Sequence, residues 1–117
     1  MKCACLPLLL ICSCIGAHAE TPQASTEVLR DDASWYVTLN EYPPGTTGPK
    51  HTHEGRRLVY VLGGGTVVLT GADGSSVEVT LETGQLVERP PETHTVSNSG
   101  PTTVRLLETE SRMAAKP

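Results

Sequence analysis

Short runs rich in valine, threonine and leucine, separated by turns of glycine, proline and asparagine, fill almost the whole chain after residue 34. No window of this region has the 3.6-residue apolar period of an amphipathic helix. In Val77, Val79 and Leu81 the apolar residues alternate strictly with polar ones, which is typical of a strand with one buried face. The pattern predicts an all-β domain, and many short strands at this spacing favour a closed barrel or jelly roll.

The expected strands are short segments that end at turn signals. They are residues 34–42, 50–53, 57–62, 66–70, 76–81, 86–89, 94–98 and 102–108. Asp73-Gly74 predicts a hairpin between two of them, and Gly63-Gly64-Gly65 predicts another turn. Because the chain has no phenylalanine, we expect valine and leucine to build the core.

The first residues have the features of an export signal. Lys2 is followed by the apolar segment ACLPLLLICSCIG, and Ala17-His18-Ala19 has the small-x-small pattern of a signal peptidase site. We therefore expect residues 1–19 to be removed and the mature protein to be periplasmic or secreted. The apolar segment is shorter than the about 20 residues that a membrane span needs, so no integral membrane span is expected.

Every cysteine of the chain lies within this segment, at Cys3, Cys5, Cys12 and Cys14. Cleavage would leave a mature domain without thiols or disulfides, which excludes cysteine chemistry. The alternative is that ICSC at residues 11–14 acts as a lipobox, in which case Cys14 would carry a lipid anchor.

The remaining residues, 20–117, are enough for one domain. We divide them into an N-terminal arm or edge strand at 20–34, a barrel at 35–109 and a C-terminal tail at 110–117. Without Lys2 the formal charge is 8 basic minus 13 acidic residues, or −5, and the basic residues are scattered along the chain. A nucleic-acid partner is therefore not expected.

Three histidines lie in the mature region, as the pair His51 and His53 and as His94 on a later expected strand. Because side chains on a strand alternate in direction, the pair points one way, and a neighbouring strand can bring His94 to it. We expect one divalent metal ion, with Fe, Mn, Ni, Zn and Cu as candidates, and with coordination positions open to water or substrate. The alternative is an ordinary surface pair of histidines.

The segments around these histidines resemble the two sequence motifs of the cupin superfamily. GTTGPKHTH at residues 45–53 and RRLVYVLGG at 56–64 resemble the first motif. GQLVERP at 84–90 and HTVSN at 94–98 resemble the second. The resemblance covers about residues 35–109. It implies a small single-domain cupin β-barrel, which is a double-stranded β-helix or jelly roll, with a metal inside and often a homodimer.

Two positions depart from these motifs. The glutamate that usually completes the metal set aligns with Arg57, or with Leu58 at a spacing one longer, and neither binds a metal. Pro91 or Glu92 stands where the second motif usually has glycine. The two-His-one-carboxylate set of non-haem iron oxygenases is therefore missing. Cupins with three histidines nevertheless include thiol dioxygenases and diketone-cleaving enzymes, so a dioxygenase stays among the expectations.

Arg57 shares the strand parity of His51 and His53, so on this register it points into the barrel. Its guanidinium has paired donors that fit a carboxylate, and we expect it to bind an anionic small-molecule ligand together with the metal. On the alternative register Leu58 and Tyr60 face inward and Arg57 lies in water.

Few residues could act as an acid or base beside the metal. Glu92 has the strand parity of His94. Glu54 follows His53 and on a regular strand faces away, and Tyr60 either lines the pocket or packs on the sheet. The sequence therefore predicts an exported metal-binding cupin, with a metal-dependent enzyme acting on a small molecule as one function. The alternatives are a non-enzymatic module that binds or senses a metal or small molecule, and a metal-free structural barrel.

Overall fold

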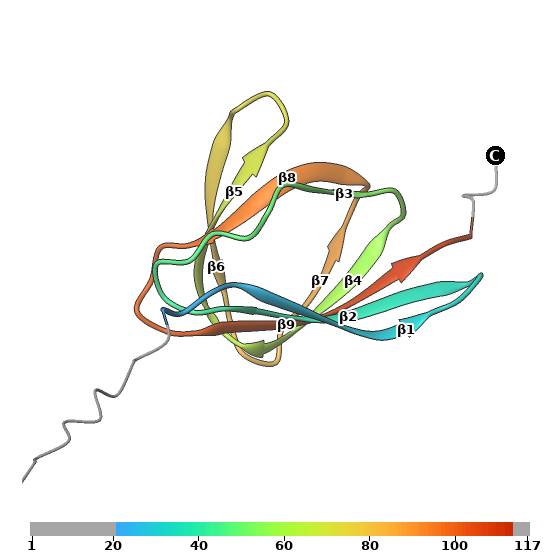
Figure 1. Ribbon diagram of the computed structural model, residues 1–117, viewed down its shortest axis with the longest axis horizontal. Helices are drawn as coiled ribbons and strands as arrows, with labels where there is room; N and C mark the ends of the chain where they lie inside the picture. Colours follow the sequence, from blue (N-terminus) through green and yellow to red (C-terminus); the bar gives the residue numbers. More distant parts are fainter. Residues whose placement is uncertain (1–20, 114–117) are drawn as a thin grey trace, which may run out of the picture.

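The computed structural model describes residues 21–113 and contains nine strands and, in this part of the chain, no helix (Figure 1). The prediction of an all-β fold is confirmed. The strands are β1 (Ser25–Asp31), β2 (Trp35–Tyr42), β3 (His51–His53), β4 (Arg57–Gly63), β5 (Gly65–Gly71), β6 (Ser76–Leu81), β7 (Leu86–Arg89), β8 (Glu92–Asn98) and β9 (Val104–Ser111).

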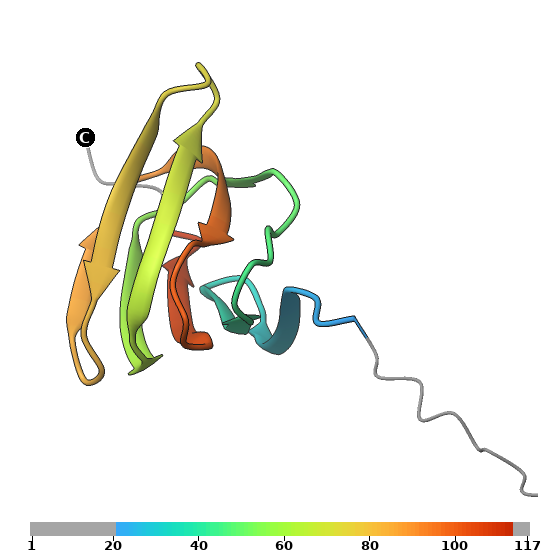
Figure 2. The same ribbon diagram turned by 90° about the vertical axis from the view of Figure 1, so that its left-hand side faces the viewer.

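The strands form two antiparallel sheets that face each other across the core. The five-stranded sheet has the order β1-β2-β9-β4-β7, and the four-stranded sheet has the order β3-β8-β5-β6. Figure 1 shows β3 and β8 on the opposite side of the interior from β2 and β9. The hairpin of β5 and β6 projects at one end of the molecule (Figure 2). This arrangement is the jelly roll expected from the sequence.

Two of the expected turns direct the chain. At Gly63-Gly64-Gly65 the chain leaves β4 of one sheet and enters β5 of the other. A Cβ atom on Gly64 would lie 2.4 Å from the carbonyl oxygen of Leu81, so the close approach of the backbones requires glycine. Gly74 closes the hairpin of β5 and β6 with a φ of +83°, in the left-handed region that glycine adopts without strain.

The ends of the described region show where the barrel stops. β1 pairs with β2 at the edge of the five-stranded sheet and is exposed along its whole length. β9 continues to Ser111, past the barrel end that we placed at residue 109. The cleavage after residue 19 and the lipidation of Cys14 fall outside the described residues and stay predictions. No helix that could cross a membrane is present between residues 21 and 113.

Valine and leucine build most of the core, as expected from the absence of phenylalanine. The buried apolar side chains come from five strands and are Tyr42, Val59, Val61, Val67, Val96, Val104 and Leu106. In β4 the inward positions alternate with the exposed Leu58 and Tyr60. Arg57 therefore points inward with Val59 and Val61, and the alternative register is wrong.

Candidate metal centre

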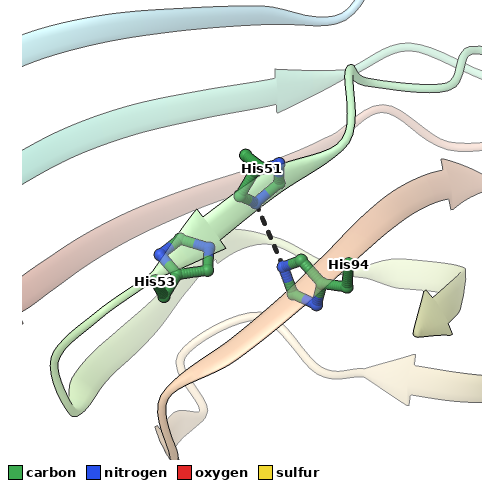
Figure 3. Close-up of side chains that lie close together, drawn as sticks. All are labelled: His51, His53 and His94. Atoms are coloured by element: carbon green, nitrogen blue, oxygen red, sulfur yellow. Dashed lines mark hydrogen bonds between the residues drawn. The ribbon is translucent and has the colours of Figure 1, made fainter. Parts of the chain in front are cut away.

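The pairing of β3 with β8 brings the three histidines together. In this antiparallel ladder His51 lies opposite His94, and His53 lies opposite Glu92. Because His51 and His53 are separated by one residue, they project from the same face of β3. One ring nitrogen from each histidine lies within 4.8 Å of the others, as the close-up in Figure 3 shows. The structure thus brings together the three histidines that we predicted from the sequence as metal ligands.

An oxygen atom lies next to the Nδ1 atom of each imidazole. His51 Nδ1 is 2.8 Å from the carbonyl oxygen of Pro49, and His53 Nδ1 is 2.9 Å from Oε1 of Glu110. His94 Nδ1 is 2.8 Å from Oε1 of Glu92, although this contact is not aligned as a hydrogen bond. Oxygens in these positions favour the tautomer with the proton on Nδ1, which leaves the Nε2 lone pairs free to bind a cation.

The separation of the Nε2 atoms of His51 and His94 fits a metal ion. The Nε2 atoms of His51 and His94 are 3.1 Å apart, which is a hydrogen-bond distance if one of them carries the proton (Figure 3). With both protons on Nδ1, the two Nε2 lone pairs would face and repel each other. A metal bonded to both at about 2.0–2.1 Å would place them about 2.9–3.4 Å apart for bond angles between about 90° and 110°. Nε2 of His53 is buried and has no hydrogen-bond partner among residues 21–113. A divalent ion would satisfy all of these atoms.

The environment keeps at least two of the histidines neutral. Burial lowers the pKa of His53 to about 3, and the positive charge of Arg57 acts in the same direction. Burial also lowers the pKa of His94, although the carboxylate of Glu92 opposes it. Only the neutral imidazole binds a metal, so these side chains are ready to bind one at neutral pH.

Arg57 lies beside this cluster and is 2% exposed. Its Nη2 donates to Oε2 of Glu92 at 3.1 Å, and its Nη1 lies 3.5 Å from the carbonyl oxygen of Pro90. Its Nε is 3.4 Å from Oε1 of Glu108. The paired donors that we expected to hold a ligand carboxylate are therefore already engaged within the protein. Of its three nitrogen atoms, Nε is the one without a hydrogen-bond acceptor in the described part of the chain.

Glu92 stands behind the His94 ring, on its Nδ1 side. Its two oxygens also accept hydrogen bonds from Arg89, at 2.8 and 3.1 Å, and one of them accepts from Arg57. Burial alone would raise the pKa of Glu92, but these hydrogen bonds and positive charges lower it, so the group is a carboxylate. Glu92 therefore orients His94 and neutralises two arginines, which is a different position from that of a metal ligand.

The other two acid or base candidates point elsewhere. Tyr60 is 42% exposed and lies on the face of β4 that points away from the barrel. Glu54 follows β3 and is exposed. Because the side chains alternate along β4, a tyrosine at residue 60 cannot share the interior with Arg57 and Val59. These placements argue against both residues as groups that act at the metal.

Sequence reasoning missed two glutamates of β9 that border the cluster. Glu108 accepts a hydrogen bond from Asn40 and contacts Arg57, and burial raises its pKa. Glu110 contacts His53, as described above. A signal was present, because Glu108 and Glu110 continue the alternation of the buried Val104 and Leu106. Carboxylates in such a row usually mark a solvated face, so the residue types alone do not identify this row as interior.

Two cavities meet at the cluster. One has a volume of about 70 Å³ and is lined mainly by valine and leucine side chains from both sheets. The other has a volume of about 400 Å³ and is lined by polar groups of β1, β2 and β9 together with β3 and the segment before it. Tyr42, His51 and Glu108 border both cavities. The metal centre therefore has an apolar space on one side and a larger space with more polar side chains on the other.

Comparisons with known proteins agree with this fold. The sequence profile of the family described as "Cupin domain" matches residues 38–110. A cupin domain from Bordetella pertussis Tohama I superposes with a TM-score of 0.71 at 28% identity, over 80% of this chain and 98% of that one. A Klebsiella pneumoniae protein with a double-stranded β-helix domain gives a TM-score of 0.64 at 19% identity, over 83% of this chain and 84% of that one.

An enzyme is among the similar structures. The polyketide cyclase RemF from Streptomyces resistomycificus superposes with a TM-score of 0.56 at 26% identity. The match covers 77% of this chain and 66% of that protein. None of the curated proteins compared with this chain matches it.

Proposed function

Because the chain belongs to the cupin family, we propose that it uses His51, His53 and His94 to hold one divalent metal ion at which a small molecule binds. The observation that carries this proposal is the orientation of the three imidazoles. An oxygen atom lies beside each Nδ1 and favours the orientation in which the Nε2 lone pairs of the three rings point toward one another. A metal ion between the rings would accept these lone pairs. Such orienting contacts are typical of histidines that bind metals.

The chemistry of the site follows from the number of ligands. Three imidazoles leave coordination positions open, and a bound ion would supply a Lewis acid for a small molecule. Imidazole donors suit Zn, Fe, Ni and Cu, and Mn stays a weaker candidate on the same grounds. The cavities of about 70 and 400 Å³ on either side provide space for a small-molecule ligand.

Two observations favour an enzyme. Glu108 is a buried carboxyl group that borders both cavities, and burial raises its pKa, which is typical of groups that hold or release a proton in a reaction. The similarity to a polyketide cyclase extends over 77% of the chain. A dioxygenase activity, which we expected from other three-histidine cupins, is tested by oxygen consumption of the iron-loaded protein with candidate substrates.

One observation favours the alternative of a module that binds or senses a small molecule without reaction. Each carboxylate near the histidines already has a partner in the protein: Glu92 with Arg89, Glu108 with Asn40, and Glu110 with His53. A donor of this kind stabilises the charged form of a carboxylate and so makes the group a weaker base. Turnover of any substrate by the metal-loaded protein decides between the two functions.

We also propose that the protein is exported to the periplasm or the medium, because residues 1–19 have the features of a signal peptide. The intact mass of the mature protein tests this. A mass that begins at residue 20 is expected, whereas a diacylated Cys14 would establish the lipid anchor. The homodimer that the family resemblance implies is tested by sedimentation of the same sample.

The metal content of the purified protein tests the proposed site. We expect about one metal ion per chain after purification without an affinity tag, and close to none for His51→Ala, His53→Ala and His94→Ala. Thr52→Ala is the matched control, because Thr52 lies between the two histidines of β3 but is exposed and pairs with Thr93. Retention of the metal by all three histidine variants would show that the assignment is wrong.

A further inference from the structure

The apolar cavity beside the histidines indicates the size of the ligand. Its volume is about 70 Å³, and aliphatic side chains such as Val67, Val79 and Leu81 line the part that lies away from the histidines. One water-sized group needs about 10–15 Å³ of such space, so the cavity has room for about five groups. A short branched alkyl group fits this space, whereas a long chain or a large ring would extend beyond its apolar walls.

The charged groups at the histidine end of this cavity indicate the sign of the ligand. Arg57 and Arg89 line it together with the carboxyl group of Glu108, and Glu92 behind the lining pairs with both arginines, so the formal charges of these protein groups balance. A divalent ion on the three histidines would make this end more positive. In a space with few water molecules, such a field favours an anionic group over a neutral or cationic one.

An unused donor indicates where an anionic group would lie. The Nε–H of Arg57 is buried and makes no hydrogen bond within residues 21–113, and Oε1 of Glu108, its ion-pair partner, lies 3.4 Å away. A buried donor without an acceptor is unfavourable. Arg57 lines the cavity, so a small shift of its side chain would turn this donor to a ligand oxygen there, and a charged oxygen makes the stronger hydrogen bond.

From the size of the apolar cavity, the charge at its histidine end and the unused donor of Arg57, we infer that the ligand of this site is a short branched-chain carboxylate. Its carboxylate would lie at the histidine end, between the metal and Arg57, and its alkyl group would lie against Val67, Val79 and Leu81. The inference rests on the proposed function, because the carboxylate needs the metal ion for binding.

Calorimetric titration of the zinc-loaded protein tests the inference with a set of simple probes. Isovalerate is expected to bind at least tenfold more tightly than acetate, because each buried methylene group favours binding about fourfold. Octanoate is expected to bind no more tightly than isovalerate, because its chain exceeds the cavity. Isovaleramide has the same shape without the charge and is expected to bind at least tenfold more weakly.

A pair of variants on β6 shows whether the alkyl group lies in the cavity. Val79→Phe fills the cavity at a distance from the histidines and should reduce the affinity for isovalerate to that for acetate. Val77→Phe is the matched control, because Val77 is on the same face of β6 but is 56% exposed and outside the lining. It should leave the preference for isovalerate unchanged.

Equal affinities for acetate and isovalerate in zinc-loaded protein would overturn the inference and leave the metal site intact. Equal effects of Val79→Phe and Val77→Phe would overturn it in the same way. The zinc content of each sample is measured before the titration, so the proposed function is tested separately. A protein that does not retain zinc would contradict both the proposed function and the inference that rests on it.

Discussion

The two ends of the barrel interior are built from the same strands but from opposite kinds of residues. Along β4 the inward side chains change from Val61 to Arg57, and along β9 they change from Val104 to Glu108. All four are buried. His94 joins the polar end from β8. One end is therefore a conventional core, and the other end buries charges and imidazoles.

This difference separates stability from function within one small barrel. Burial of valine and leucine at the apolar end favours folding. Burial of Arg57 and Glu108 at the polar end carries a desolvation cost that their attraction only partly offsets. A chain selected for stability alone would do as well with apolar residues there. The polar end is explained by the histidines that it surrounds.

The largest effect is expected when one charge is removed from the polar end. Arg57→Ala leaves Glu92 and Glu108 without their shared cation, and loss of one partner of a buried ion pair lowers the free energy of unfolding by about 3–5 kcal/mol. Urea denaturation measures this. The double variant Arg57→Ala/Glu108→Gln should regain part of the loss, and no recovery would mean that the two charges are not coupled.

A smaller effect, on stability alone, is expected at the apolar end. Val61→Ala removes methyl groups from a fully buried site, at about 0.5–1.5 kcal/mol of unfolding free energy for each group. The folded variant should bind metal as tightly as the original protein, because Val61 is absent from the lining of both cavities. A tenfold change in metal affinity would show that the two ends are not separate.

An effect on metal binding alone is expected from Glu110, which orients His53. Glu110→Gln keeps the shape of the side chain but weakens its contact with Nδ1, and loss of such a contact lowers metal affinity about 10- to 100-fold. Competition with a chromogenic chelator measures the affinity. Glu41→Gln is the control on the same sheet, because Glu41 pairs with the exposed Arg105. Equal metal affinities of Glu110→Gln and Glu41→Gln would show that Glu110 does not contribute to metal binding.

The smallest effect is expected on the outer surface of the barrel. Arg105→Ala breaks an exposed ion pair with Glu41, and such pairs contribute less than about 1 kcal/mol to the free energy of unfolding. Thermal and urea unfolding should differ little from the original protein, and metal affinity should not change. A loss as large as that of Arg57→Ala would mean that burial does not explain the difference between the two pairs.

The sequence predicted most of the strands because they depend on local patterns. It left the register of β4 open between two alternatives, because residues 58–62 are all apolar or aromatic, and only the structure shows that Arg57 faces inward with Val59 and Val61. The hairpin at Asp73-Gly74 follows equally from its turn residues. The three histidines could be grouped because their spacing resembles known motifs, although the opposition of His51 and His94 depends on a pairing of distant strands.

The partners of these residues could not be predicted. Glu108 and Glu110 become part of the site only because β9 lies beside β4, a contact between segments far apart in the sequence. In β2 the polar Thr38 and Asn40 face the interior while Leu39 faces outward, so hydrophobicity alone would select the wrong face. In this half of the barrel, hydrogen bonds and ion pairs between strands decide which side chains face the interior, and hydrophobicity does not.

The central claim is that three imidazoles and no protein carboxylate hold the metal ion. X-ray absorption spectroscopy of the zinc-loaded protein tests it most directly, because multiple scattering from the rings reveals the number of imidazole ligands. The account predicts three imidazole nitrogens at about 2.0–2.1 Å from zinc, with the remaining positions filled by water or another small ligand. It also predicts the same spectrum for Glu108→Gln. Fewer than three imidazoles, or a loss of an oxygen ligand in Glu108→Gln, would contradict it.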